Sequence, residues 1–203
     1  MSGAYTFYGD KKSGNCLKVL WTAQALNVPF RWIDIDVLKS ETRTEEFLRL
    51  NPAGQVPLAI LPDGRALAQS NAIILHLAEG SDLVPGDPYA RAKMFEWLFW
   101  EQYSHEPAIA VRRFKKIYLG QPDDEIDPAL LQKGRRALGV MELALLGRDY
   151  LAGDSLSVAD ISLVAYTRLA HEGGFDLTEF PQVLHWVGRV ERALGLEPAR
   201  EAA

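Results

Sequence analysis

Hydrophobic and polar positions follow different patterns in the two halves of the chain. Up to about residue 80, short β-branched and aromatic runs alternate with segments of helical spacing. From about residue 89, nearly every apolar position recurs at three- or four-residue intervals. Between Glu79 and Pro88, glycine, proline, serine and aspartate cluster, and such a stretch does not continue a helix. We therefore expect one domain over residues 1–80, a linker over 81–88 and a second domain over 89–203.

The first half predicts an α/β domain with the element order β-α-β-α-β-β-α. Strands are expected at residues 5–8, 30–37, 57–61 and 65–68, and helices at 16–26, 44–50 and 70–79. The β-α-β crossover makes the first two strands parallel. Pro62, Asp63 and Gly64 favour a tight turn, so the last two strands form an antiparallel hairpin. Together these elements make a four-stranded mixed sheet.

The second half predicts an all-α bundle. Helices are expected at residues 89–119, 128–146, 158–171 and 181–194. The clearest helix boundary is Ser157, because the acidic Asp160 follows it three residues later and the pair resembles a capping box.

Composition narrows the classes of function. Cys16 is the only cysteine among the 203 residues, which excludes an intramolecular disulfide and a multi-cysteine metal site. The formal net charge of −5 disfavours an extended nucleic-acid surface, because affinity there comes from basic side chains that neutralise phosphates. The first residues contain no basic run before an apolar stretch, and no apolar run approaches the ~18 residues of a membrane span. We expect a cytoplasmic protein that binds neither nucleic acid nor membrane.

Three short segments carry candidate chemistry. Residues 12–16 join the first strand to the first helix, and α/β sheets often bind ligands at such a junction. Within this segment, Ser13 or Asn15 either caps the helix or faces a ligand. Gln55, Val56 and Pro57 open a strand, either as an ordinary edge or as a backbone that pairs with an extended peptide. Gln69 and Ser70 open a helix whose amides suit a small carboxylate, or Ser70 only caps it.

The order and spacing of these motifs resemble the cytosolic glutathione S-transferases. The motifs are Ser13-Gly-Asn-Cys16, Asn51-Pro-Ala-Gly-Gln-Val-Pro57, Gln69-Ser-Asn-Ala-Ile73 and, in the helical half, Ser157-Val-Ala-Asp160. The resemblance spans nearly the whole chain. It implies a thioredoxin-like N-terminal domain followed by an α-helical bundle domain. Within the family, the chain is similar to bacterial members of the theta- and delta-like serine type.

The resemblance also implies roles for these residues. Pro57 would be a cis proline, and the Val56 backbone would pair with the cysteinyl backbone of glutathione. Ser70 with Gln69 would hold the γ-glutamyl carboxylate. Ser13 would be the catalytic serine that stabilises the glutathione thiolate, with Asn15 as a helper. Gln55 and Thr42 stand where theta-like enzymes often have basic or histidine side chains for the glycyl end.

The electrophile is expected between the domains, against the first long helix. The candidates on this helix are Phe99, Tyr103, His105 and Arg112, although such residues often serve a core or a solvated face. The basic run from Arg112 to Lys116 is expected to be a solvated face that guides an anionic substrate. Glu101 and His105 lie four residues apart without a further cluster, so we predict no metal.

We therefore hypothesise that the protein is a glutathione transferase of the EC 2.5.1.18 type. Glutathione would be the co-substrate, and the second substrate would be a small hydrophobic electrophile. The enzyme would be a homodimer with a role in detoxification. Two alternatives stay open. In the first alternative, Cys16 is the nucleophile of a glutathione-dependent thiol/disulfide reductase or peroxidase. Because the chain has a single thiol, glutathione would then have to resolve each mixed disulfide. In the other alternative, the protein binds glutathione without catalysis, as an interaction module.

Overall fold

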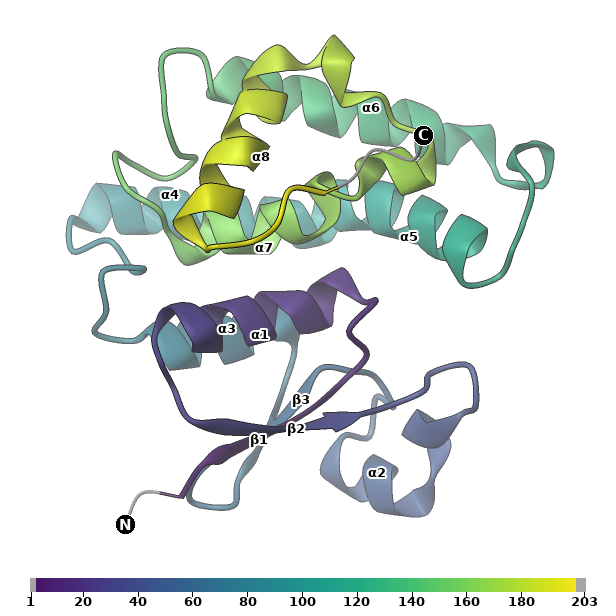
Figure 1. Ribbon diagram of the computed structural model, residues 1–203, viewed down its shortest axis with the longest axis vertical. Helices are drawn as coiled ribbons and strands as arrows, with labels where there is room; N and C mark the ends of the chain where they lie inside the picture. Colours follow the sequence, from purple (N-terminus) through teal and green to yellow (C-terminus); the bar gives the residue numbers. More distant parts are fainter. Residues whose placement is uncertain (1–2, 200–203) are drawn as a thin grey trace. The chain divides into compact units, whose positions relative to one another are not determined.

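The computed structural model describes residues 3–199 and divides into two compact units, which meet in sequence at the bond between Ser81 and Asp82. The first unit contains the sheet and the second is helical (Figure 1). Within residues 3–199, no helix is both long enough and apolar enough to span a membrane.

The first unit contains the predicted four-stranded mixed sheet. Its strands are β1 (Tyr5–Gly9), β2 (Phe30–Asp34), β3 (Leu58–Ile60) and β4 (Ala66–Ala68), in the spatial order β2-β1-β3-β4. Strand β1 pairs in parallel with β2 and antiparallel with β3, and β3 pairs antiparallel with β4. Gly64 lies in the β3–β4 turn with a φ of +87°, a value that glycine adopts without steric cost. Both predicted pairings are therefore confirmed.

Three helices cover the sheet: α1 (Gly14–Ala25), α2 (Glu45–Leu50) and α3 (Ser70–Ala78). Helices α1 and α3 lie side by side on one face, and α2 lies on the other side (Figure 1). Phe7, Val19, Leu58 and Ile73 are fully buried, so the apolar faces of β1, α1, β3 and α3 form the core of this unit.

The strand directions bring several chain segments to one edge of the sheet. Strand β4 is antiparallel to β3, which is antiparallel to β1, so β1 and β4 run in the same direction and end at the same edge. The register agrees, because Leu58 at the start of β3 pairs with both Tyr8 and Ala68. We call this the C-terminal edge; β1 and β4 end at it, and β3 begins at it.

The second unit is the predicted helical bundle. Its α-helices are α4 (Pro88–Trp100), α5 (Glu106–Ile117), α6 (Pro128–Ala144), α7 (Val158–Thr167) and α8 (Pro181–Ala193). Short 3₁₀ helices lie at Asp123–Glu125, Ala170–Gly173 and Leu177–Glu179. Every residue of α7 is buried, and α4, α5 and α8 pack against it. Helix α7 is therefore the centre of this unit.

The prediction of one helix over residues 89–119 is wrong in its middle. A π-helical segment, Glu101–His105, separates α4 from α5. Pro107 explains the irregularity, because proline has no N–H for the helical ladder and its ring clashes with the carbonyl four residues before it. The predicted helix over 158–171 also ends early, at Thr167.

The predicted strand over residues 30–37 is shorter than expected and ends at Asp34. The Asp36 carboxylate accepts hydrogen bonds from the backbone amides of Leu38 and Lys39 at 3.0 and 3.2 Å. An aspartate that binds its own following backbone favours a turn over a strand.

The predicted capping box at the start of α7 is confirmed. The Asp160 carboxylate accepts from the Ser157 backbone N–H at 3.0 Å and from the Ser157 hydroxyl at 2.8 Å. It also accepts from the Leu151 backbone N–H at 3.0 Å and from Trp186 Nε1 at 2.9 Å. Burial raises the pKa of Asp160, and these four hydrogen bonds act in the opposite direction. One carboxylate thus joins α7, α8 and the loop before α7.

Candidate functional site

The three candidate segments of the first unit converge on the C-terminal edge of the sheet. Residues 10–13 follow β1 into α1, Val56 and Pro57 precede β3, and Gln69 follows β4 into α3. A direct contact joins two of them, because the Ser70 hydroxyl donates to Asn15 Oδ1 at 3.0 Å. The fold therefore places two helix N-termini, with their partial positive charge, beside the entry to β3.

Ser13 is the N-cap residue of α1, but its side chain does not cap the helix. Its backbone carbonyl accepts from the amides of Cys16 and Leu17 at 3.1 and 3.0 Å. Among residues 3–199, no helix amide donates a capping hydrogen bond to its hydroxyl, which is half-buried. The first turn of α1 also lacks an acidic side chain, so nothing there neutralises the helix dipole. The Ser13 hydroxyl remains able to donate to an anion.

Cys16 is fully buried within the first turn of α1. The Asp10 backbone N–H donates to its Sγ atom at 3.4 Å, and a Cβ atom on Gly9 would come within 3.1 Å of that sulfur. Burial raises the pKa of the Cys16 thiol to about 12, against smaller opposing effects of hydrogen bonds from the Asp10 backbone and the Ser13 side chain. A thiol with this pKa is protonated at neutral pH, so Cys16 is poorly suited to nucleophilic attack.

The second segment has the cis geometry that the resemblance implies, since the Val56–Pro57 peptide bond is cis. Pro57 is buried, Val56 is half-buried and Gln55 is exposed. Asn51 organises the preceding loop: its Nδ2 donates to the Gln55 carbonyl at 2.7 Å, and its Oδ1 accepts from the Ala53 amide at 3.2 Å. An asparagine before proline is a known turn signal, which agrees with the end of the preceding helix at Leu50, whereas the bond to the Gln55 carbonyl depends on the folded loop.

Arg43 is a residue that the sequence analysis did not single out. Its Nη1 atom lies 3.5 Å from the Ala53 carbonyl oxygen, beside Gly54. Ten residues separate Arg43 from Ala53, so no local pattern indicates this proximity. Arg43 places a positive charge next to the loop that leads to Val56.

The third segment has an unusual backbone. Gln69, the N-cap residue of α3, has a φ of +72°, which residues other than glycine rarely adopt. Gln69 is exposed, whereas Ser70 is only 6% exposed. Strained backbone of this kind concentrates at ligand-binding sites. No sequence signal predicts this conformation, because glutamine has no preference for positive φ.

The electrophile candidates of the helical unit fall into two groups. Phe99 and Tyr103 are 71% and 88% exposed, and Phe99 stacks on Phe95 with ring centroids 6.3 Å apart. His105 is instead fully buried, with Nε2 at 2.9 Å from the Thr167 hydroxyl oxygen. Because that hydroxyl donates its own hydrogen to the Leu163 carbonyl, His105 is the donor to Thr167.

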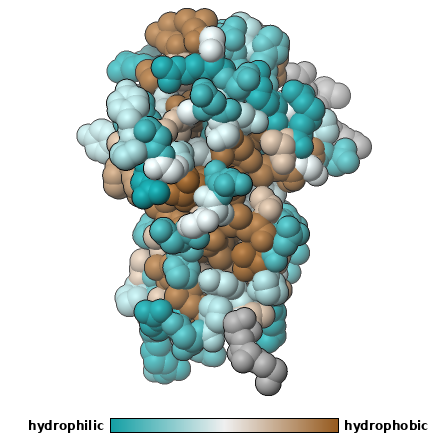
Figure 2. Space-filling model, turned by 90° about the vertical axis from the view of Figure 1, so that its left-hand side faces the viewer, coloured by the Kyte–Doolittle hydropathy of each residue, from teal (hydrophilic) through white to brown (hydrophobic). Residues whose placement is uncertain are grey.

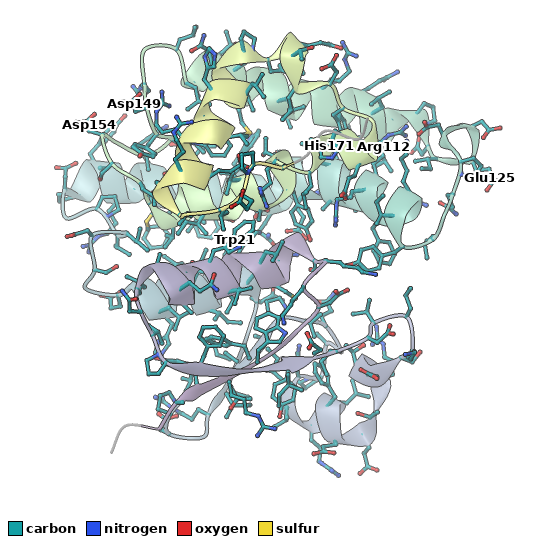
Figure 3. The ribbon with its side chains drawn as sticks, in the orientation of Figure 1. Trp21, Arg112, Glu125, Asp149, Asp154 and His171 are labelled. Carbon is teal, nitrogen blue, oxygen red and sulfur yellow. The ribbon has the colours of Figure 1, made fainter. Side chains whose placement is uncertain are left out.

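The prediction that the basic run from Arg112 is a solvated face is wrong for its first two members. Arg112 is 4% exposed, and it donates to the Gly173 carbonyl at 2.7 Å and to Asp123 at 2.5 Å. Arg113 is 5% exposed and pairs with Glu172 at 2.6 Å. Figure 3 shows Arg112 and His171 in the same part of the helical unit. These arginines therefore fasten α5 to the 3₁₀ segments, since buried charges require partners.

Exposed apolar side chains alone do not identify an electrophile site. Figure 2 shows one face of the molecule, on which both units expose hydrophobic residues among hydrophilic ones. Such exposure is ordinary for a folded protein. Within residues 3–199, no group of three or more histidine, cysteine, aspartate or glutamate side chains is placed to hold a metal ion.

Comparisons with known proteins agree with this arrangement. Residues 13–79 match the model of the glutathione S-transferase N-terminal domain, and residues 97–193 match that of the C-terminal domain. Glutathione S-transferase theta-1 of Mus musculus is 30% identical over 208 residues, which cover 96% of this chain and 85% of the relative.

Solved structures are also similar to this chain. A glutathione S-transferase from Pseudomonas fluorescens Pf-5 is 44% identical with a TM-score of 0.90, over 93% of this chain and 95% of that one. The yeast prion protein Ure2p in complex with glutathione is 26% identical with a TM-score of 0.86, over 96% and 97% of the two chains.

Proposed function

Since the chain belongs to the glutathione S-transferase family, we propose that it binds glutathione at the C-terminal edge of its sheet and transfers it to a small hydrophobic electrophile. The observation that carries this proposal is the convergence of three segments on that edge, where the Ser13 hydroxyl makes no capping bond to an amide of α1 and contacts only the weakly bonding Cys16 thiol among the groups that the described residues place on it. Glutathione is the co-substrate, and the residues of the site require no metal for this chemistry.

Glutathione is a short, extended peptide, and the edge offers complementary groups along its length. The Val56 backbone pairs with the cysteinyl residue of glutathione, next to the cis bond to Pro57. Ser70, Gln69 and the first amides of α3 hold the γ-glutamyl group, because free amides at a helix N-terminus favour a carboxylate.

The glycyl carboxylate of glutathione lies at the opposite end of this peptide. Gln55 is exposed beside this end and carries no charge. Arg43 supplies the positive charge there, because its guanidinium lies against Ala53 and Gly54, immediately before Gln55. A guanidinium suits a carboxylate through paired N–H donors.

The reaction requires the glutathione thiolate, and a free thiol with a pKa of ~8.5 is mostly protonated at neutral pH. Ser13 donates its hydroxyl hydrogen to the sulfur, and the N-terminus of α1 adds a partial positive charge. Both effects favour the thiolate and lower its pKa. The sulfur then forms a bond to the electrophilic carbon, and the leaving group departs with the bonding electron pair.

Within the helical unit, Phe99 and Tyr103 are the candidates for contact with the electrophile, because both rings are exposed. His105 and Arg112 have partners inside their own unit, which indicates structural roles. We also propose, from family membership, that the protein is a cytoplasmic homodimer with a role in detoxification. Sedimentation equilibrium tests the dimer, and a monomer at all concentrations contradicts it.

The central test compares Ser13→Ala with Cys16→Ala in the conjugation of glutathione to 1-chloro-2,4-dinitrobenzene. We expect Ser13→Ala to lower kcat/KM on the order of 10²-fold, the usual cost of removing one donor to a developing anion. Its pH-rate profile should also move to higher pH, because the bound thiol loses a group that lowers its pKa. Cys16→Ala should keep an activity close to that of the wild type.

Other outcomes favour the two alternative functions. Loss of activity only in Cys16→Ala supports a reductase or peroxidase that uses this thiol. Saturable binding of glutathione without turnover of any electrophile or peroxide supports a binding module. Ure2p is relevant to the latter, because its structure with glutathione is similar to this chain and another of its solved structures is described as a nitrogen regulation fragment.

A further inference from the structure

Helices α1 and α3 are joined at their N-termini by a side-chain hydrogen bond. Ser70, the first residue of α3, donates its hydroxyl hydrogen to Oδ1 of Asn15, the second residue of α1, over 3.0 Å. Ser70 is 6% exposed, and a buried hydroxyl without a partner costs free energy. Asn15 therefore satisfies Ser70 within the protein, across 55 positions of sequence.

This bond restricts the Ser70 side chain. A serine hydroxyl carries a single hydrogen and rotates freely about its side-chain bonds unless an acceptor holds it. With Asn15 Oδ1 as that acceptor, the hydroxyl of Ser70 has a defined position next to the first amides of α3. Because its hydrogen is held by Asn15, Ser70 offers a ligand its oxygen lone pairs, which suit the ammonium of the γ-glutamyl group, while the first amides of α3 suit its carboxylate. A prearranged acceptor loses less conformational entropy when the ammonium binds, so the same contact yields a higher affinity.

The direction of Asn15 separates it from the sulfur-activating serine. Ser13 is the N-cap residue of α1 and has an extended backbone, whereas Asn15 is the second residue of the helix, so the two side chains leave the chain from different backbone conformations. Asn15 is directed toward α3, where its oxygen accepts the Ser70 hydrogen.

We propose that Asn15 is a positioning residue that acts through Ser70 in glutathione binding, and not a second donor to the glutathione sulfur. This inference rests on the proposed function and specifies the γ-glutamyl part of its site. It assigns different tasks to neighbouring residues of one loop. Ser13 serves the chemical step, whereas Asn15 serves affinity.

The test measures glutathione binding by calorimetry and conjugation kinetics for Asn15→Ala, Ser70→Ala and the double variant. We expect Asn15→Ala to raise the Kd for glutathione about fivefold, the effect of one neutral hydrogen bond. The kcat at saturating glutathione and the pH-rate profile should not change. In the Ser70→Ala background, Asn15→Ala should weaken binding no further, because its partner is already absent.

Ser13→Ala is the matched control, because it is expected to move the pH-rate profile that Asn15→Ala leaves in place. Asn15→Ser, whose side chain is too short to reach Ser70, provides a second variant if Asn15→Ala does not fold. A shifted pH-rate profile, additive effects of Asn15→Ala and Ser70→Ala, or an unchanged Kd would each overturn the inference. If wild-type protein binds no glutathione in the calorimeter, the inference and the proposed function both fail. Binding with the wrong pattern among variants overturns the inference alone.

Discussion

Helices α1 and α7 begin with the same local signal and use it differently. In both, the N-cap residue is a serine, and the third helical residue is buried: Cys16 after Ser13, and Asp160 after Ser157. In α7 the Ser157 hydroxyl and backbone N–H both bind the carboxylate at 2.8 and 3.0 Å. In α1 the third residue is a thiol, and a thiol is only a weak hydrogen-bonding partner.

The third helical residue decides whether the N-cap serine has a structural role, as Ser157 has, or remains available to a ligand, as Ser13 does. Asp160 accepts from Ser157 and also joins α7 to Trp186 and Leu151, so the carboxylate and the groups that donate to it are satisfied inside the protein. At α1, the corresponding position leaves the Ser13 hydroxyl without a capping bond in the part of the chain that the structure describes. A serine hydroxyl that makes no capping bond and lies beside a weakly bonding thiol is available to a ligand.

The largest expected effect is that of Asp160→Ala on stability. The change leaves the buried N–H groups of Ser157, Leu151 and Trp186 without their acceptor. Breaking such a buried charged network costs about 3–5 kcal/mol of unfolding free energy. Urea denaturation measures the loss. A loss below about 1 kcal/mol, the value for an ordinary cap, would show that Asp160 is not the organising group of α7.

The next largest effect is the loss of stability that the Cys16 thiol causes at high pH. Its pKa rises from 9.0 to about 12 on folding, so between these values the folded protein retains a proton that the unfolded chain releases. This contribution to stability is complete below pH 9 and decreases as the pH rises. We expect the wild type to lose about 1 kcal/mol relative to Cys16→Ala between pH 7.5 and pH 10. Parallel stability curves for the two proteins would contradict the assignment.

Ser157→Ala should have an effect of similar size at neutral pH. The substitution removes one hydroxyl donor from Asp160, while the other three hydrogen bonds to the carboxylate remain. Loss of an N-cap serine typically costs about 1 kcal/mol. Urea denaturation measures this change, and a loss of stability equal to that of Asp160→Ala would show that the two groups act only as one unit.

Ser13→Ala should have the smallest effect on stability, a few tenths of a kcal/mol at most, because no capping bond is lost among the described residues. The same variant is expected to lose most of its conjugation activity. Stability and activity, measured on one preparation, therefore distinguish the two serines. A loss of stability as large as that of Ser157→Ala would show that Ser13 is a structural cap after all.

Much of the fold could be predicted from local patterns. Strand and helix types, both strand pairings, the turn at Gly64 and the capping box at Ser157 follow from periodicity and turn chemistry. The π-helical segment was missed because helical spacing continues through it, and only Pro107 signals the interruption. The burial of Arg112 and Arg113 was missed because Asp123, Gly173 and Glu172 lie elsewhere in the chain.

The candidate site could be predicted in part. Its three segments were recognised as motifs, and the strand directions of the predicted sheet bring them to one edge. The contact between Asn15 and Ser70, the position of Arg43 and the positive φ of Gln69 were not predictable. Each depends on residues that approach one another only after the sheet and its helices have packed.

By itself, the sequence determined the types and order of the elements, the single thiol and the serines that begin α1 and α7. These properties depend on neighbours within a few residues, and periodicity and capping preferences reveal them. Only the tertiary structure decided that Ser157 is bound to a buried carboxylate, that Ser13 does not cap its helix and that the Cys16 thiol is protonated. Burial and hydrogen-bond partners are properties of the packed chain, and they decide which of two similar side chains can serve a ligand.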